Sequence, residues 1–141
     1  MIPTPRSLFL GPLLTSLAAA LCLGTAAPAH AQDLVNPFAN DVQAARLGED
    51  LFGRNCQQCH NSRGKGGKGP QLVRGAWGPG GANSDGYMFQ TISRGRPNTQ
   101  MGGFGGALSD AEIWQVVTFL RAESVRVKQE QKPRTDDVPL W

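Results

Sequence analysis

The pentapeptide Cys56-Gln57-Gln58-Cys59-His60 constrains this chain more than any other stretch. Two thiols separated by two residues can lie on one side of a turn, with an imidazole directly after them. In that arrangement both sulfurs can bond to one flat group, while the imidazole nitrogen can bind a metal at its centre. The remainder of the fold must therefore leave room for such a group beside this turn.

C-x-x-C-H is the attachment signature of c-type haem. Two other interpretations compete with it, a redox-active or structural disulfide and half of a zinc site. Zinc needs four ligands, usually Cys or His, and beyond the first 31 residues the chain has no other Cys or His. A thioredoxin-like C-x-x-C would need a βαβ setting, which the Gly-rich surroundings do not supply. We predict one covalent haem c, attached through Cys56 and Cys59 and ligated by His60.

Residues 1–31 have the order of a cleaved secretory signal peptide. Arg6 is their only charge, an apolar run spans 8–23, and Ala29 and Ala31 occupy the small-residue positions of an A-x-A cleavage site. We therefore expect export to the periplasm. A retained membrane anchor is the alternative, although the run is at the short end of the roughly 20 residues that a span requires. Lipidation at Cys22 is a second alternative.

Cleavage after Ala31 leaves 110 of the 141 residues, with two Cys, one His and two Met. The only His belongs to the motif, so a second protein ligand of the usual kind must be Met88 or Met101 unless another chain contributes one. The formal charge changes from +3 to +2 when Arg6 leaves. This mild basic excess favours weak steering toward an acidic partner. No basic run is interleaved with aromatic residues, which argues against nucleic-acid binding.

Apolar periodicity predicts a first helix from Val42 to near Gly53, leading directly into the motif. Asn40 is its candidate N-cap, with Gln43 at the spacing of a capping box. Gly48 lies within this helix and costs about 1 kcal/mol relative to Ala, a cost that a closely crossing helix would explain.

Two further helices follow. A short one over 85–92 can be capped by Ser84 or Asp85, and a longer one begins at the capping box of Ser109 and Glu112 and reaches residue 122. Beyond it, residues 123–141 form a charged tail, for which disorder is the default. The helix could continue into the tail but would end by Pro133, and the closing Leu140-Trp141 is a candidate docking point.

Residues 61–81 contain eight glycines. A loop of this length without secondary structure is usually functional or disordered, and Gly lets backbone approach a flat cofactor closely. Trp77 in this loop has two interpretations. It either covers the haem edge or donates its indole N–H to a propionate, or it anchors the loop locally.

The two methionines have different settings. Met88 pairs with Ile92 at i,i+4 on the short helix, which is typical of a packed side chain. Met101 lies in an irregular segment, where a thioether can be directed at a target without helix constraints. We therefore favour Met101 as the second iron ligand.

These residues together resemble class I c-type cytochromes, the small monohaem electron carriers. The resemblance spans roughly 42–122 and rests on the motif, on Gly69-Pro70-Gln71-Leu72, on Met101 and on the two flanking helices. It implies an all-α fold of about three to four helices, with Gly-rich loops around a covalent haem. It also implies that the first and last helices cross closely, with Gly48 and Phe52 against Val116, Phe119 and Leu120.

The resemblance further implies that the Pro70 carbonyl accepts a hydrogen bond from His60, and that Trp77 and Arg96 lie near the propionates. One departure is Gly102-Gly103, where many relatives carry Pro after the Met, so we expect a more mobile Met loop. The domain organisation we predict is a signal peptide (1–31), a lead-in segment (32–40), a cytochrome c domain (41–122) and the charged tail (123–141).

The segment 86–121 looks like bacterial cytochromes that serve periplasmic dehydrogenases, notably quinoprotein alcohol dehydrogenases, and like cytochrome modules of oxidases. The function so implied is a periplasmic one-electron carrier rather than an enzyme, working as a monomer in transient complexes with a dehydrogenase donor and an oxidase or cytochrome acceptor. Two alternatives remain. The chain could be a fixed electron-transfer subunit of a larger complex, or a haem enzyme or gas sensor with an open iron site.

Overall fold

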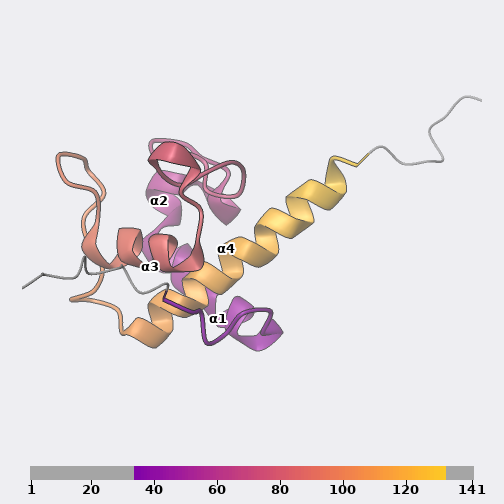
Figure 1. Cartoon of the computed structure of the whole chain (residues 1–141), viewed down its shortest axis with the longest axis horizontal. Helices are drawn as coiled ribbons and strands as arrows, with labels where there is room; N and C mark the ends of the chain where they lie inside the picture. Colours follow the sequence, from indigo (N-terminus) through magenta and orange to yellow (C-terminus); the bar gives the residue numbers. More distant parts are fainter. Residues whose placement is uncertain (1–33, 133–141) are drawn as a thin grey trace, which may run out of the picture. The chain divides into compact units, whose positions relative to one another are not determined.

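A computed structural model describes residues 34–132 of the chain. The predicted signal peptide and residues 133–141 of the predicted tail lie outside this range. The described part is helical and has no strand, as the all-α prediction requires. Its elements, labelled in Figure 1, are α1 (Val42–Asn55), α2 (Gln57–His60), the 3₁₀ turns η1 (Ser62–Gly64) and η2 (Pro79–Gly81), α3 (Asp85–Arg94) and α4 (Asp110–Glu130).

Helix α1 begins where predicted, but its cap differs. Asp41, not Asn40, is the N-cap, and its carboxylate accepts hydrogen bonds from the amides of Gln43 and Ala44 at 2.8 and 3.0 Å. Asn40 instead has a φ of 65°, a left-handed conformation that Asn tolerates better than most residues. The predicted capping box of Asn40 and Gln43 is therefore wrong. The helix also passes Gly53 and ends at Asn55, whose side chain donates to the Leu51 carbonyl at 2.8 Å.

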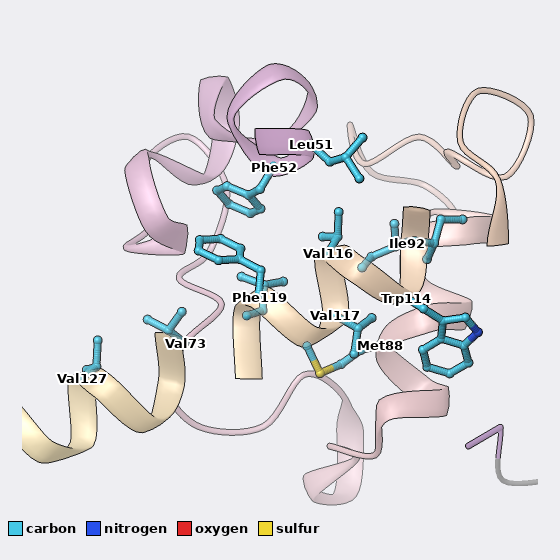
Figure 2. Packing of buried hydrophobic residues seen from close by; sticks show 12 residues of the cluster. Leu51, Phe52, Val73, Met88, Ile92, Trp114, Val116, Val117, Phe119 and Val127 are labelled. Atoms are coloured by element: carbon cyan, nitrogen blue, oxygen red, sulfur yellow. The ribbon is translucent and has the colours of Figure 1, made fainter. Parts of the chain in front are cut away.

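Helices α1 and α4 cross at Gly48, as the sequence predicts. A Cβ atom at this position would lie 1.9 Å from the backbone oxygen of Gln115, so the two backbones are in direct contact. Beside this contact the rings of Phe52 and Phe119 pack with their centroids 5.4 Å apart (Figure 2). Both aromatic rings are almost fully buried and belong to the central apolar cluster of the domain.

The lead-in segment is fastened to the helices by Asn36, which is buried. Its amide nitrogen donates to Asp85 on α3 and to Thr118 on α4, each at 3.1 Å, and its oxygen accepts from the Phe38 amide at 2.9 Å. Helix α3 itself is capped by the Ser84 hydroxyl, one of the two caps that we predict. The lead-in thus orders the start of α3 against α4.

Helix α4 begins with the predicted capping box of Ser109 and Glu112. It continues past the predicted boundary at residue 122, and both Glu123 and Val127 are buried. In Figure 1 its yellow C-terminal end extends beyond the other helices. The helical part of the predicted tail is therefore continuous with the domain. Among residues 34–132, no helix combines the length and apolar character needed to cross a bilayer.

Candidate cofactor-attachment site

The motif forms a single turn, as its spacing predicts. The Cys56 carbonyl accepts hydrogen bonds from the amides of both Cys59 and His60, at 3.1 and 3.0 Å. This turn continues from α1, because the Cys56 amide donates to the Phe52 carbonyl at 2.9 Å. Helix α1 therefore fixes where the two sulfurs lie. Cys56 and Cys59 do not form a disulfide with each other; Cys56 is half-buried and Cys59 is exposed.

Burial, and secondarily the neighbouring Cys59, raise the pKa of the Cys56 thiol to about 11. In the folded chain this thiol is therefore protonated at neutral pH, and it is a poor nucleophile because the thiolate is the reactive form. A redox-active disulfide needs the opposite, a cysteine with a lowered pKa. The electrostatics of the turn thus argue against the thioredoxin-like interpretation.

The His60 ring is buried and held in one orientation. Its Nδ1 atom donates to the Pro70 carbonyl at 2.8 Å, which is the hydrogen bond that the resemblance implies. This bond leaves Nε2 as the nitrogen available to a metal and makes the ring a better ligand. Gly69 lies directly over the ring, since a Cβ atom there would be 2.8 Å from His60 Cε1.

Backbone hydrogen bonds hold the loop after the motif on the same turn. Gly66 donates to the His60 carbonyl and Gly69 to the Cys59 carbonyl, both at 2.8 Å. These contacts place Pro70 within reach of His60. Glycine is therefore needed at residue 69 for close approach, while residue 66 has a φ of 90° that also favours glycine.

The two methionines lie in the settings that their sequence contexts predict. Met88 is 1% exposed and packs in the central cluster with Val117 (Figure 2). Met101 lies outside any helix and is half-buried. Its segment is closed by a hydrogen bond from the Arg96 amide to the Met101 carbonyl at 2.9 Å. Of the two, only Met101 has a side chain that is free of the packed core.

Trp77 and Arg96 contact each other. The indole N–H of Trp77 donates to the Leu72 carbonyl at 3.1 Å, and the Arg96 guanidinium donates to the Trp77 carbonyl. Trp77 is thus a local anchor of the Gly-rich loop, one of its two predicted roles. Because Arg96 also bonds Met101 through its backbone, these contacts connect the Leu72 segment to the Met101 segment. A role for either residue at the propionates stays a prediction.

A network of ion pairs, which the sequence did not reveal, joins α4 to α1 and to the segment just after the motif. Glu123 of α4, 1% exposed, accepts from Arg63 Nε at 2.8 Å and from Arg126 Nε at 2.9 Å, while Arg63 also donates to Glu49 of α1. Burial alone would raise the pKa of Glu123, but the hydrogen bonds from Arg126 and Arg63 outweigh it and lower the pKa to about 2. One signal in the sequence could have indicated that Glu123 is buried. Glu123 lies at helical spacing from Leu120 and Val127 and so continues the buried face of α4.

These residues suit a c-type haem. Two thiols share one turn, and an imidazole presents Nε2 beside them. A thioether lies in a separate irregular segment. Half-buried apolar side chains near these segments pack against the central cluster; they include Cys56, Leu72, Trp77, Phe104 and Leu108. Within residues 34–132 no three His, Cys, Asp or Glu side chains gather as a metal site.

Residues 43–120 match the protein family described as cytochrome c oxidase, cbb3-type, subunit III. The chain belongs to this family of c-type cytochromes. As a c-type cytochrome it is an electron-transfer haem protein, and the family implies that its group is haem c.

Two curated relatives match this cytochrome. A dihydro-heme d1 dehydrogenase of Pseudomonas aeruginosa is 35% identical over 112 residues, covering 66% of this chain and 22% of the relative. The cbb3-type cytochrome c oxidase subunit CcoP of Rubrivivax gelatinosus is 39% identical over 74 residues, covering 50% and 24%. The cytochrome thus spans about a quarter or less of each of these relatives.

Solved structures agree on the fold. Cytochrome cL from Hyphomicrobium denitrificans superposes with a TM-score of 0.57 at 28% identity, covering 62% of this chain and 51% of that one. Cytochrome cL from Methylophaga aminisulfidivorans gives 0.54 at 24% identity, covering 74% and 75%. These similarities confirm the class I cytochrome c fold that we predict from the sequence.

Proposed function

We propose that this cytochrome is a periplasmic one-electron carrier with a single haem c. Cys56 and Cys59 would hold the haem through thioether bonds, and His60 and Met101 would bind its iron. When bound, the haem supplies the one-electron redox chemistry. The observation that carries the proposal is the His60 ring, which is buried and bonded through Nδ1 to Pro70 at 2.8 Å, so that Nε2 is left for the iron.

Ligation by His60 and Met101 would leave no open position for a substrate, so the protein could only pass electrons. Met/His ligation raises the reduction potential relative to more electron-donating ligand sets, which suits an acceptor downstream of a dehydrogenase. The chain contributes position and burial. Brief encounters through interfaces below about 1,200 Å² are sufficient for electron transfer of this kind.

The partners we propose are periplasmic redox proteins. A quinoprotein alcohol dehydrogenase or similar enzyme would donate electrons, and an oxidase or another cytochrome of the respiratory chain would accept them. Similarity to a cytochrome cL structure at 28% identity supports an electron-transfer role in general, and the choice of donor comes from the sequence resemblance. The protein would act as a monomer, with no nucleic-acid partner and no span in the mature chain after removal of the signal peptide at 1–31.

A fixed subunit of a larger complex is the second candidate, favoured by the 39% identity to an oxidase subunit. A third is a haem enzyme with an open iron site, favoured by the 35% identity to a dihydro-heme d1 dehydrogenase. The third candidate needs a distal acid or base near Met101, and the chain offers no second His beyond residue 31.

Visible spectroscopy of the periplasmically matured protein tests the proposal. The oxidised wild type should show a low-spin spectrum with the weak far-red band of a sulfur–iron bond, and the reduced protein should not bind carbon monoxide. Met101→Ala should lose the band. Met88→Leu is the matched control and should keep it, because this volume-conserving change leaves the core packed.

A high-spin wild-type spectrum or ready carbon monoxide binding would refute the closed carrier. A far-red band that survives in Met101→Ala would instead refute Met101 as the second ligand. Co-purification from the native periplasm then separates the first two candidates. A free carrier elutes at the size of one chain, whereas a fixed subunit elutes with its complex.

A further inference from the structure

The segment that carries Met101 is attached to the end of α3 through its backbone. We call residues 95–105 the Met101 loop. The Phe104 amide donates to the Ile92 carbonyl at 2.9 Å, and the Gly105 amide donates to the Ser93 carbonyl at 3.0 Å. These two carbonyls lie in the last turn of α3, where the helix has no N–H donors of its own to offer them. The loop therefore supplies the C-terminal cap of the helix.

Glycine is required where the two backbones meet. A Cβ atom at Gly103 would lie 2.6 Å from the Ser93 oxygen and 2.8 Å from the Arg94 carbonyl carbon. On the opposite side of the contact, a Cβ atom at Gly95 would lie 2.6 Å from both the Gly103 nitrogen and the Met101 oxygen. Each of these near atoms belongs to the backbone, so no side-chain rotation could relieve the overlap.

Gly102 differs from Gly103 although the two are adjacent. A Cβ atom at Gly102 would meet nothing within 4 Å. One glycine of the pair therefore faces open space, and the other is in van der Waals contact with α3. The sequence showed only that two glycines follow Met101. The structure shows that of these two, Gly103 is the one whose lack of a side chain lets the loop contact α3.

We propose that Gly103 is a positioning residue for the second iron ligand. By letting the loop lie on the α3 backbone, it holds Met101 at a fixed place. The proposal rests on the proposed role of Met101. It predicts that the loop is a preformed ligand holder rather than the mobile segment that the missing Pro suggests.

The test compares Gly103→Ala with Gly102→Ala in the matured holoprotein. Exogenous imidazole competes with the methionine sulfur for oxidised iron, so its apparent affinity reports how often the sulfur leaves. In Gly103→Ala we expect this affinity to rise at least about tenfold, with a weaker far-red band and new carbon monoxide binding after reduction. Gly102→Ala should stay within about twofold of the wild type.

Urea denaturation of both variants separates positioning from packing. If Gly103→Ala lowers stability but leaves imidazole affinity equal to that of Gly102→Ala, Gly103 is only a packing residue and the proposal is wrong. Met101→Ala belongs in the same series. If it keeps the far-red band, the ligand assignment itself fails, and that failure is distinct from equal behaviour of the two glycine variants.

Amide hydrogen exchange in the wild type keeps the proposal testable even if Gly103→Ala does not mature. The Phe104 and Gly105 amides should exchange as slowly as those inside α3, because the α3 carbonyls accept their hydrogen bonds. Exchange of both amides as fast as that of the exposed Gly106 would overturn the proposal.

Discussion

Substituting Gly48 by Ala tests the helix crossing on which the fold depends. The added Cβ would lie 1.9 Å from the Gln115 oxygen, whereas a carbon and a carbonyl oxygen in contact are normally about 3.3–3.6 Å apart. The helices would have to separate by more than about 1 Å. That movement would also loosen the Phe52–Phe119 contact, whose centroids are 5.4 Å apart.

The expected change in the free energy of unfolding is the balance of two opposing effects. Ala is the better helix former by about 1 kcal/mol, which favours the variant. Overpacking of a tight contact typically costs about 1–3 kcal/mol, and a clash with backbone lies at the upper end or above. We therefore expect Gly48→Ala to lower the free energy of unfolding by about 2 kcal/mol, or roughly 10 °C in Tm for a domain of this size.

Gly53 supplies the matched control, because it lies in the same helix and a Cβ there would meet nothing within 4 Å. Gly53→Ala should gain up to about 1 kcal/mol from helix propensity alone. Urea titration of the oxidised holoprotein, followed by far-UV circular dichroism, measures both variants against the wild type. If Gly48→Ala is as stable as Gly53→Ala, the crossing is not a backbone contact and the argument fails.

Two further predictions concern contacts that the sequence did not reveal. The folded pKa of Glu123, about 2, lies below its unfolded value of about 4.3, so its ion pairs stabilise the fold above that unfolded value. Stability should decline as the pH falls from about 5 toward 2, and Glu123→Gln should flatten that decline in urea titrations; an unchanged slope would refute the assignment. Asn36→Ala should cost about 1–3 kcal/mol by the same assay because its buried bonds to Asp85 and Thr118 are lost. The exposed control Asn40→Gly, at a φ of 65° that glycine adopts readily, should change the free energy of unfolding by less than about 0.5 kcal/mol. Equal losses in the two variants would contradict the role of Asn36.

Much of the site could be predicted from short-range patterns. The C-x-x-C-H turn, the Ser109–Glu112 capping box and the helical setting of Met88 each involve residues within one or two helical turns, and the structure has all three. Gly48 was predictable for a different reason. A glycine inside a helix has a known cost, which a close helix crossing offsets.

Other contacts left no such pattern. Asn40 and Asp41 are both good caps, so the sequence could not decide which of them begins α1. The bonds of Glu123 to Arg63 join residues 60 positions apart, and only the tertiary fold brings them together. The attachment of the Met101 loop to α3 uses backbone atoms, which every residue has, so only the glycines at 95 and 103 mark it.

The two proposed iron ligands are held in place by different kinds of hydrogen bond. His60 is fixed by a side-chain bond to Pro70 at 2.8 Å, while Met101 is fixed through the backbone of its loop and the 2.9 Å bond from Arg96 to its carbonyl. Arg96 also donates to Trp77, and Trp77 donates to Leu72, two residues after Pro70. A displacement of one ligand segment would therefore strain bonds that lead to the other. Electron transfer is fast when the ligands move little between oxidation states, and holding both segments on rigid elements is how a chain achieves this.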